Sequence, residues 1–328
     1  MLHAETQDGF PISIPATFHG YNVIQLLGCG STCIVILVED EKTQQRFSAK
    51  IISKKDVQNR NMLKAIINEI KVLQTLDHPH IIKVQEAFDM KNEDEEEYYV
   101  IIMEYCSNGD LLSYATGPGF KSEAEKKKIL TGFLEAIKYL HNNGISHGDI
   151  KSENILLDDF YSPKLCDFGF CRLSQFAGDD SKNGTLYYAA PELFVKGQFD
   201  TFKTDIWAIG ITLYSLAELQ FPFKDGDQNC IVRQILNARL SIRQGMEPKL
   251  RALVERCTVK NPELRPTIDD VLHDPYLFIG ESSGKKNNIS KKKLFNQCIQ
   301  ETLQQEENAW NSSSLYDNVE SFEPVFTI

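Results

Sequence analysis

The chain has 328 residues, which is enough for one large domain or for two lobes of about 100–200 residues each. Its apolar fraction of 42% and charged fraction of 25% are those of an ordinary globular protein. The net charge of −11, from 35 basic and 46 acidic residues, excludes the overall basic character that non-specific nucleic-acid binding requires, so we expect no nucleic-acid partner.

Residues 1–20 are predicted to be an irregular lead-in. They lack the charged and apolar regions of a signal peptide, and no apolar run in the chain approaches the ~20 residues of a membrane helix. The eight cysteines contain no C-x-x-C pair and are best interpreted as free thiols in a reducing compartment. We therefore expect no membrane partner and a cytoplasmic location, with the nucleus as the alternative.

Residues 21–53 contain three strand-like runs, YNVIQLLGCG, STCIVILVED and QQRFSAKIIS, separated by turn residues as in an antiparallel meander. Gly28 and Gly30 lie between the first two runs, where glycine lets backbone N–H groups approach a phosphate. A plain hairpin turn is the alternative. Lys50 lies among small and apolar residues, and it needs an anion as partner unless it faces solvent.

Residues 56–76 switch to helical spacing, and two further strands are predicted at 81–90 and 98–106. Glu69 lies close to the apolar face of the helix, where its carboxylate could clamp Lys50 or could be an ordinary flanking charge. The run KNEDEEE between the two strands is interpreted as a solvated hairpin tip.

After Gly109 the chain is mostly helical. Residues 122–143 form a helix that begins with a capping box of Ser122 and Glu125, and more helices are expected near 204–219, 228–237, 247–257 and 267–272. Strands first and helices afterwards predict an α+β protein with two segregated lobes. Residues 281–328 are predicted to be a mostly disordered tail.

The stretch HGDIKSENILLD, residues 147–158, carries the strongest chemical signal. Asp149 could accept a hydrogen bond from a substrate hydroxyl, and Lys151 could neutralise a transferred phosphoryl group. Asn154 offers a neutral oxygen to Mg²⁺. Further on, Asp167 in KLCDFGFCRL offers a carboxylate to the same kind of metal, followed by a flexible glycine.

Each of these pieces has an ordinary structural interpretation, but the ordered set does not. The glycine-rich loop, A-K in a strand, a helical Glu, H-x-D-x-K-x-x-N, D-F-G, A-P-E and D-x-W follow one another along the chain. With this set the sequence resembles the eukaryotic protein kinase family from Tyr21 to Ile279. The resemblance implies the bilobal kinase fold, with a small β-rich N-lobe at about 21–105 that contains one key helix, and a larger α-helical C-lobe at about 106–280.

The resemblance also implies an activity, the transfer of the γ-phosphoryl group of ATP to Ser or Thr hydroxyls of protein substrates with Mg²⁺ as cofactor. Lys151 and the segment from Gly184 to Tyr188 are similar to the serine/threonine branch, and AKIISKKDV, HPHIIKVQEAFD and NPELRPT are similar to the calcium/calmodulin-dependent kinase group. Adenine would be bound by a gatekeeper and hinge and by an apolar sandwich, comprising Met103, Glu104, Cys106, Val35, Ala49 and Leu156.

Structural and regulatory roles carry over in the same way. Thr185 would bridge Asp149 and Lys151, Glu192 of A-P-E would pair with Arg265, and Asp205 would brace the catalytic loop. Phe168 and Gly169 complete D-F-G, and the regulatory stack would comprise Phe168, Leu73, Val84 and His147.

Two positions depart from the family pattern. Cys33 replaces the third loop glycine, and Gly148 replaces the Arg that pairs with a phosphate on the activation loop. We therefore expect activity that does not depend on phosphorylation of that loop, where Ser181 is the corresponding site.

A few residues indicate which partners the protein would bind. Asp110 and Glu153 lie where basophilic kinases receive substrate Arg, which predicts basic residues N-terminal to the target, unless both are plain surface charges. The amphipathic stretch 288–303 could bind a tail-directed regulator such as calmodulin. The competing functions are a pseudokinase scaffold and a small-molecule kinase. The presence of Lys50, Glu69, Asp149, Asn154 and Asp167 favours catalysis, and GTLYYAAPE favours a polypeptide substrate.

Overall fold

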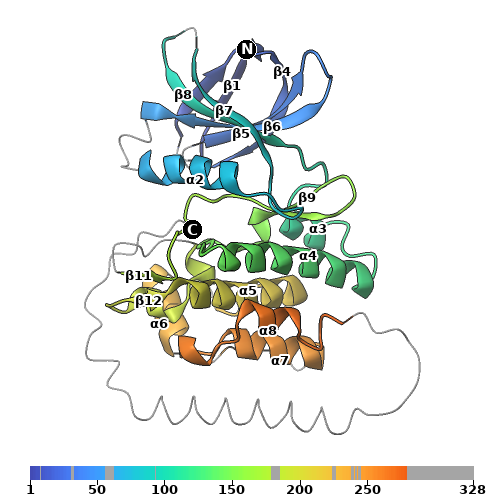
Figure 1. Ribbon diagram of the computed structural model, residues 1–328, viewed down its shortest axis with the longest axis vertical. Helices are drawn as coiled ribbons and strands as arrows, with labels where there is room; N and C mark the ends of the chain where they lie inside the picture. Colours follow the sequence, from blue (N-terminus) through green and yellow to red (C-terminus); the bar gives the residue numbers. More distant parts are fainter. Residues whose placement is uncertain are drawn as a thin grey trace. The chain divides into compact units, whose positions relative to one another are not determined.

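The computed structural model describes residues 1–7, 9–30, 33–55, 63–92, 94–178, 185–223, 227–237, 240, 242 and 245–278. The described residues form two compact units, one within residues 1–109 and 156–169, and one within residues 110–155 and 170–278 (Figure 1). The first is rich in strands and the second in helices, which confirms the predicted bilobal α+β fold. Ser181, Gly184, residues 56–62 of the predicted helix and the tail 281–328 lie outside the described residues.

The first unit is built on a six-stranded antiparallel sheet, and the predicted strands are confirmed. The spatial order is β3-β4-β5-β6-β8-β7. The strands comprise β3 (Thr17–Phe18), β4 (Tyr21–Cys29), β5 (Cys33–Asp40), β6 (Arg46–Ser53), β7 (Val84–Lys91) and β8 (Glu97–Glu104).

The two faces of this sheet bury different sets of side chains because successive residues of a strand point to opposite faces. One face carries a core that includes Ile36, Ala49 and Ile102. The other face carries Ile52 and Ile101, which pack with Ile66 of the helix α2 (Leu63–Thr75). The sheet therefore has one face for α2 and a second face that needs another cover.

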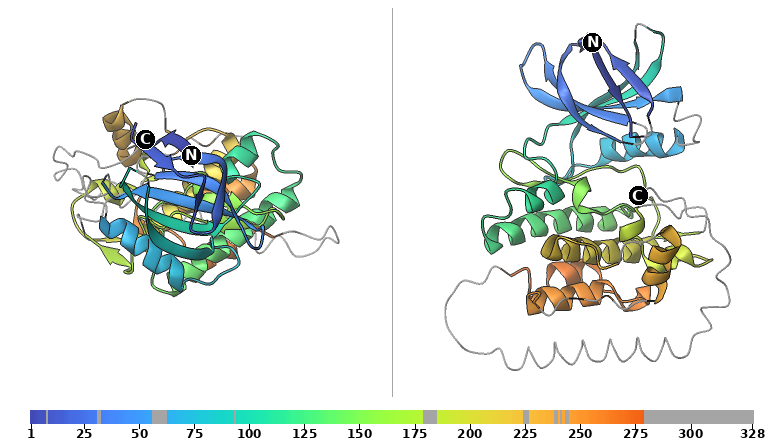
Figure 2. Two further views of the ribbon diagram at one scale, coloured as in Figure 1. Left: turned by 90° about the horizontal axis from the view of Figure 1, so that it is seen from above. Right: turned by 180° about the vertical axis from the view of Figure 1, so that it is seen from behind.

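Residues 1–20 supply part of that cover, so the prediction of an irregular lead-in is wrong. They form an antiparallel hairpin of β1 (Leu2–Glu5) and β2 (Pro11–Ile14), followed by β3. Ile12 and Ile14 are 1% and 0% exposed and belong to the same core as Ile36. Figure 2 shows the hairpin against the sheet in two further directions. The short alternation in PISI is a weak strand signal, and the core it enters comes from residues far along the chain.

The described helices of the second unit lie within a few residues of the predicted ranges, except for the first, Leu111–Thr116, for which no range was predicted. They comprise α3 (Leu111–Thr116), α4 (Glu123–Asn142), α5 (Thr201–Glu218), α6 (Gln228–Asn237), α7 (Pro248–Cys257) and α8 (Ile268–Leu272). α5 packs against α7 and α4 packs against α8. α5 is buried on nearly all sides, with Trp207 at 0% exposure, as expected for a helix without a continuous polar stripe.

Short elements were not predicted. β9 (Ile155–Leu157) and β10 (Pro163–Leu165) form a two-stranded ladder, and β11 (Phe176–Ala177) pairs with β12 (Phe199–Asp200). Half of the capping box is also corrected: Ser122 accepts from the N–H of Glu125 at 3.1 Å, but the Glu125 carboxylate accepts from Lys121 N–H at 2.6 Å instead of turning back to Ser122.

No helix within the described ranges is long and apolar enough to cross a membrane.

Candidate active site

The glycine-rich turn joins β4 and β5 in the first unit. The N–H of Gly30 donates to the carbonyl of Cys33 at 2.8 Å and closes the turn. A Cβ on Gly28 would meet nothing within 4 Å, whereas a Cβ on Gly30 would lie 2.9 Å from the sulfur of Cys33. A side chain at residue 30 would therefore require the Cys33 side chain to move, whereas the space beside Gly28 is open.

Lys50, Glu69 and Asp167 come together in the same unit. The Lys50 ammonium lies 2.7 Å from Glu69 Oε1 and 3.4 Å from Asp167 Oδ1. The side chains of Lys50 and Glu69 are 16% and 4% exposed. Burial alone would lower the pKa of Lys50, but the charges of Glu69 and Asp167 raise it well above its usual value. Lys50 is thus a permanent cation between a buried carboxylate and a more exposed one.

The backbone at Asp167 is unusual, with a φ of 62° in the left-handed region that non-glycine residues rarely adopt. Backbone strain of this kind persists where the surrounding structure imposes it, often at functional positions. The next residue, Phe168, is fully buried, and a Cβ on Gly169 would only make ordinary contacts with Asp167 and Glu69. Asp167 is therefore held between a buried anchor and a small residue.

The residues that were predicted to contact adenine do not all lie on the same face of the sheet, and the prediction for Ala49 is wrong. Val35 is the register partner of Lys50 and shares its face of the sheet. Ala49 is fully buried in the opposite core, next to Ile36 and Ile102, so it cannot line a site on the Lys50 face. Ser48 takes that place, and its hydroxyl donates to the Glu104 carbonyl at 3.1 Å. Counting two residues back from Lys50 would have found it.

The other residues that were predicted to contact adenine lie at the end of β8, shortly after it, or on β9. Met103 and Glu104 end β8, and Glu104 N–H donates to the Lys83 carbonyl at 2.9 Å. Burial raises the pKa of the Cys106 thiol to about 12, so Cys106 is a neutral thiol. Leu156 is the half-buried middle residue of β9, between two fully buried neighbours.

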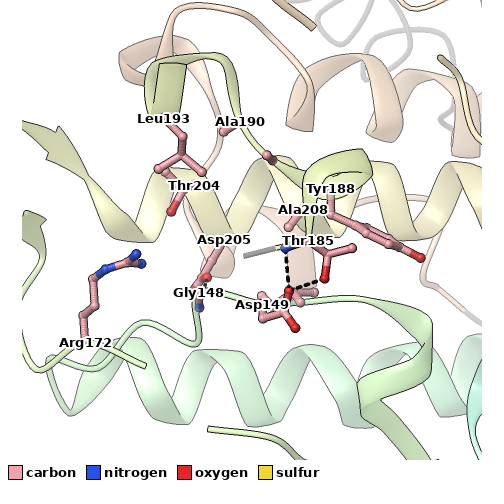
Figure 3. Close-up of a pocket in the computed structure, with 12 residues that line it drawn as sticks. Gly148, Asp149, Arg172, Thr185, Tyr188, Ala190, Leu193, Thr204, Asp205 and Ala208 are labelled. Carbon is pink, nitrogen blue, oxygen red and sulfur yellow. Dashed lines mark hydrogen bonds between the residues drawn. The ribbon is translucent and has the colours of Figure 1, made fainter. Parts of the chain in front are cut away.

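A second group of polar residues is organised in the second unit around Asp149. This carboxylate is buried, and it accepts from Thr185 N–H at 2.9 Å and from Thr185 Oγ1 at 2.7 Å (Figure 3). Lys151 Nζ lies 2.7 Å from Asp149 Oδ2 and donates to Thr185 Oγ1 at 2.7 Å. Thr185 therefore contacts both members of the ion pair and orients each of them.

Asn154 completes this group. Its amide nitrogen donates to the Asp149 carbonyl at 2.8 Å and to Asp149 Oδ2 at 3.1 Å. With the nitrogen used in this way, the amide oxygen is the atom left for a metal, as the prediction requires. No group of three or more His, Cys, Asp or Glu side chains in the described part of the chain forms a metal centre. Mg²⁺ needs only one or two protein carboxylates beside phosphates and water, so Asp167 and Asn154 have suitable chemistry for it.

The loop that carries Asp149 is anchored by Asp205 at the start of α5. The Asp205 carboxylate is 1% exposed and accepts from the backbone N–H groups of His147 and Gly148 and from His141 Nε2, each at 2.9 Å. Burial would raise the pKa of Asp205, but the hydrogen bonds from His141 and Gly148 hold it below its usual value. A charged Asp205 thus fixes the backbone of His147 and Gly148, the two residues that precede Asp149.

Gly148 has a structural reason that the sequence did not reveal. Its φ is +79°, and a Cβ there would lie 2.5 Å from the carbonyl oxygen of Phe170 and 3.0 Å from Nη1 of Arg172. The segment of Phe170 and Arg172 is held close because Ser146 and Arg172 exchange two backbone hydrogen bonds of 3.0 Å. Figure 3 shows Arg172 among the residues around a small cavity beside Gly148.

Three further carboxylates with predicted roles, those of Glu192, Asp110 and Glu153, have partners within the protein. Glu192 and Arg265 form a bidentate pair at 2.6 and 2.7 Å, with Arg265 only 2% exposed. Asp110 caps α3 by accepting from Ser113 N–H at 2.8 Å, and Glu153 accepts from Tyr188 OH at 3.0 Å. Asp110 and Glu153 therefore have local structural partners in addition to any substrate role.

Comparison with known proteins agrees with this geometry. A family model described as Protein kinase domain matches residues 21–277. CBL-interacting serine/threonine-protein kinase 14 of Arabidopsis thaliana is 31% identical over 279 residues, which cover 82% of this chain and 62% of the relative. Serine/threonine-protein kinase kin-29 of Caenorhabditis elegans is 31% identical over 268 residues, covering 81% and 32%. Sucrose non-fermenting protein kinase 1 of Fusarium virguliforme is 34% identical over 258 residues, covering 78% and 36%.

The chain thus spans between 32% and 62% of the length of these relatives. The match to the family model extends from the first residue of β4 to residue 277, beyond the end of α8, and it includes both polar groups. The chain therefore belongs to the protein kinase domain family.

Proposed function

We propose that the protein is a serine/threonine protein kinase that transfers the γ-phosphoryl group of ATP to hydroxyls of protein substrates. The observation that carries this proposal is the arrangement around Asp149, which Thr185, Lys151 and Asn154 hold by hydrogen bonds in one orientation. A carboxylate held in this way can accept a hydrogen bond from an incoming hydroxyl and direct its oxygen toward a phosphorus atom.

Each residue of the two groups then has a role. Lys151 would neutralise charge on the transferred group, and Lys50, kept cationic by Glu69, would bind the phosphates of the nucleotide. Asn154 and Asp167 would hold Mg²⁺, which supplies positive charge to the phosphate oxygens. The backbone of the hinge, from Glu104 to Cys106, would bind adenine, with Met103 as the gatekeeper before it. Val35 and Leu156 would be apolar contacts, with Ser48 in place of Ala49.

Control of this activity is inferred from Gly148. A glycine offers no cation to a phosphate on the activation loop, so we propose that the enzyme works without phosphorylation of Ser181. Substrates would carry Arg or Lys N-terminal to the target, received by Asp110 and Glu153. A tail-binding regulator and a cytoplasmic location, with the nucleus as the alternative, stay predictions.

The test is phosphate transfer from labelled ATP and Mg²⁺ by phosphatase-treated full chain to Ser/Thr peptides with and without N-terminal Arg. Asp149→Asn is expected to lower kcat by about 10²–10⁴-fold at unchanged nucleotide affinity, because it removes the oriented carboxylate. Asp94→Asn is the matched control, because Asp94 is an exposed carboxylate in a turn that is distant from Asp149 in the sequence. Ser181→Ala is expected to retain activity.

Two outcomes would contradict parts of the proposal. Wild-type protein that binds nucleotide but transfers phosphate neither to a peptide nor to itself would instead favour a scaffold. Transfer that disappears on phosphatase treatment or in Ser181→Ala would reject the interpretation of Gly148 alone.

A further inference from the structure

The outer edge of β4, the strand that leads into the glycine-rich turn, is held by the N-terminal segment. β4 is hydrogen-bonded to β5 along one edge, but on the other edge its strand partner β3 reaches only Tyr21 and Asn22. Beyond them, Val23 N–H donates to the Ala16 carbonyl, and Gln7 N–H donates to the Gly30 carbonyl, each at 2.9 Å. Gln7 and Ala16 both precede residue 21, where the match to the kinase family begins.

Gly30 is therefore tied through both of its backbone groups. Its N–H donates to Cys33 within the turn, and its carbonyl accepts from Gln7 outside the turn. Glycine has the greatest backbone freedom of any residue, so external hydrogen bonds matter most at such a position. The bond from Gln7 restrains the end of β4 at the point where the phosphate-binding backbone begins.

The residue before the donor, Thr6, is itself held in place by hydrogen bonds to Phe10. Thr6 N–H donates to the Phe10 carbonyl at 2.9 Å, and Phe10 N–H donates to Thr6 Oγ1 at 3.1 Å. Thr6 is only 4% exposed, although Gln7 beside it is exposed. The Gln7 N–H thus directly follows Thr6, a buried residue that is held by these two hydrogen bonds.

The hairpin behind this turn is anchored in the core of the unit. Ile12 and Ile14 are buried with the strand residues of one sheet face, and Leu2 and Ala4 pack on the same core. The Ser13 carbonyl also accepts from Asn92 Nδ2 at 3.2 Å. Since the hairpin is fixed to the sheet in this way, the Gln7–Gly30 bond connects the turn to a rigid body.

We propose that the N-terminal hairpin, residues 2–14, is a positioning element for the glycine-rich turn and acts through the Gln7 N–H and the Gly30 carbonyl. The proposal rests on the proposed function, because ATP is the ligand whose phosphates the turn would bind. A turn ordered before binding loses less conformational freedom when the nucleotide arrives, and the gain appears as affinity for ATP.

The decisive pair of variants is Gln7→Pro and Gln7→Ala in the full chain. Proline removes the backbone N–H, whereas alanine keeps it and removes only an exposed side chain. In nucleotide-free protein, hydrogen exchange of peptides covering residues 28–36 is expected to be faster in Gln7→Pro and unchanged in Gln7→Ala. The loss of one hydrogen bond is expected to raise the KM and Kd for ATP about three- to tenfold, with kcat at saturating ATP unchanged.

A second variant keeps the proposal testable if proline disturbs the fold. Thr6→Val retains size and burial but removes the hydroxyl that accepts from Phe10, so it is expected to shift exchange and ATP affinity in the same direction by a smaller factor. Unchanged exchange at 28–36 in both Gln7→Pro and Thr6→Val, or an equal change in Gln7→Ala, overturns the proposal. Faster exchange with unchanged ATP affinity overturns it as well.

The two parts of this experiment separate the possible failures. Exchange in nucleotide-free protein reports on the turn whether or not the protein is a kinase. Wild-type protein that binds no ATP would refute the proposed function and, because the turn would then have no phosphate to receive, this inference with it.

Discussion

Two lysine–carboxylate pairs of equal length, Lys50–Glu69 and Asp149–Lys151, are built in different ways. Both have an N–O distance of 2.7 Å. Lys50 on β6 meets Glu69 on α2, and its second carboxylate, Asp167, lies 117 residues further along the chain. Lys151 is two residues from Asp149, and both contact Thr185. The first pair depends on a helix packed against a sheet, and the second on a loop and one threonine.

The two carboxylates also differ in their environments, and this difference decides how each pair tolerates mutation. Glu69 is buried and pairs with Lys50, whereas the Asp149 carboxylate also accepts from Thr185 and Asn154. A buried charge with several hydrogen bonds tolerates the loss of one neighbour better than a buried charge that depends on one cation. The first pair should therefore respond to mutation in stability and activity, and the second mainly in activity.

The largest effect is expected from Lys50→Met. It removes the cation from Glu69 and from the phosphate-binding position, and we expect kcat/KM to fall by about 10²–10⁴-fold. The folded state should also be destabilised by about 3 kcal/mol near neutral pH, because Glu69 is left as an uncompensated buried charge. Denaturant titration and steady-state kinetics measure the two effects.

The pH dependence of this destabilisation has a definite sign. Burial raises the pKa of Glu69, while Lys50 lowers it, so the variant loses the lowering contribution. A carboxyl group with a raised folded-state pKa costs nothing below its unfolded value of about 4.3, and its cost grows as the pH rises toward the folded-state pKa. Lys50→Met should therefore be closer to wild type in acid than at neutral pH.

Lys54→Met is the matched control for this variant. Lys54 lies just beyond the same strand, but its partners Asp89 and Glu97 are exposed. It should change stability by less than about 1 kcal/mol, with no pH trend of this kind. Equal losses in both variants would show that Glu69 does not depend on Lys50.

A smaller effect is expected from Thr185→Val, which tests the loop-based pair. Valine keeps the shape of threonine but removes the hydroxyl that donates to Asp149 and accepts from Lys151. Hydrogen bonds to charged groups contribute about 1.5–3 kcal/mol, so kcat should fall by about 10- to 100-fold while the KM for ATP stays constant.

Thr185→Ser retains the hydroxyl and should recover most of the rate. A serine variant as slow as the valine variant would mean that Thr185 acts through packing. Stability should change little in either case, in contrast to Lys50→Met, because Asp149 keeps its bonds to Lys151 and Asn154.

Sequence alone predicted the helices and strands with strong periodicity and the family motifs. The helices at 204–219 and 228–237 are observed at Thr201–Glu218 and Gln228–Asn237. It did not predict the N-terminal hairpin, because the strands of the hairpin are only four residues long and acquire their burial from a distant core. Weak local signals of this kind are decided by tertiary packing.

The candidate site shows the same limit. The motif residues were found in order, but Ala49 was placed on the wrong face and Ser48 was missed, although alternation from Lys50 contains that information. The hydrogen bond from the Ser48 hydroxyl to the Glu104 carbonyl depends on the register in which β6 pairs with β8. This register is not evident from the sequence of either strand alone.

The smallest effect on activity is expected from Gly148→Ala, which tests why the loop before Asp149 contains a glycine. The left-handed φ and the Phe170 carbonyl 2.5 Å from the added Cβ should destabilise the protein by about 1–3 kcal/mol. Gly178→Ala is the control, since its Cβ meets nothing within 4 Å. Denaturant titration of both variants measures the difference, and activity per folded molecule should fall less than in Thr185→Val because Asp205 still holds the loop. Equal stability of the two alanine variants would mean that the close approach of Phe170 relaxes at little energetic cost. In that case the only consequence of Gly148 would be the absence of the Arg that pairs with a phosphate on the activation loop.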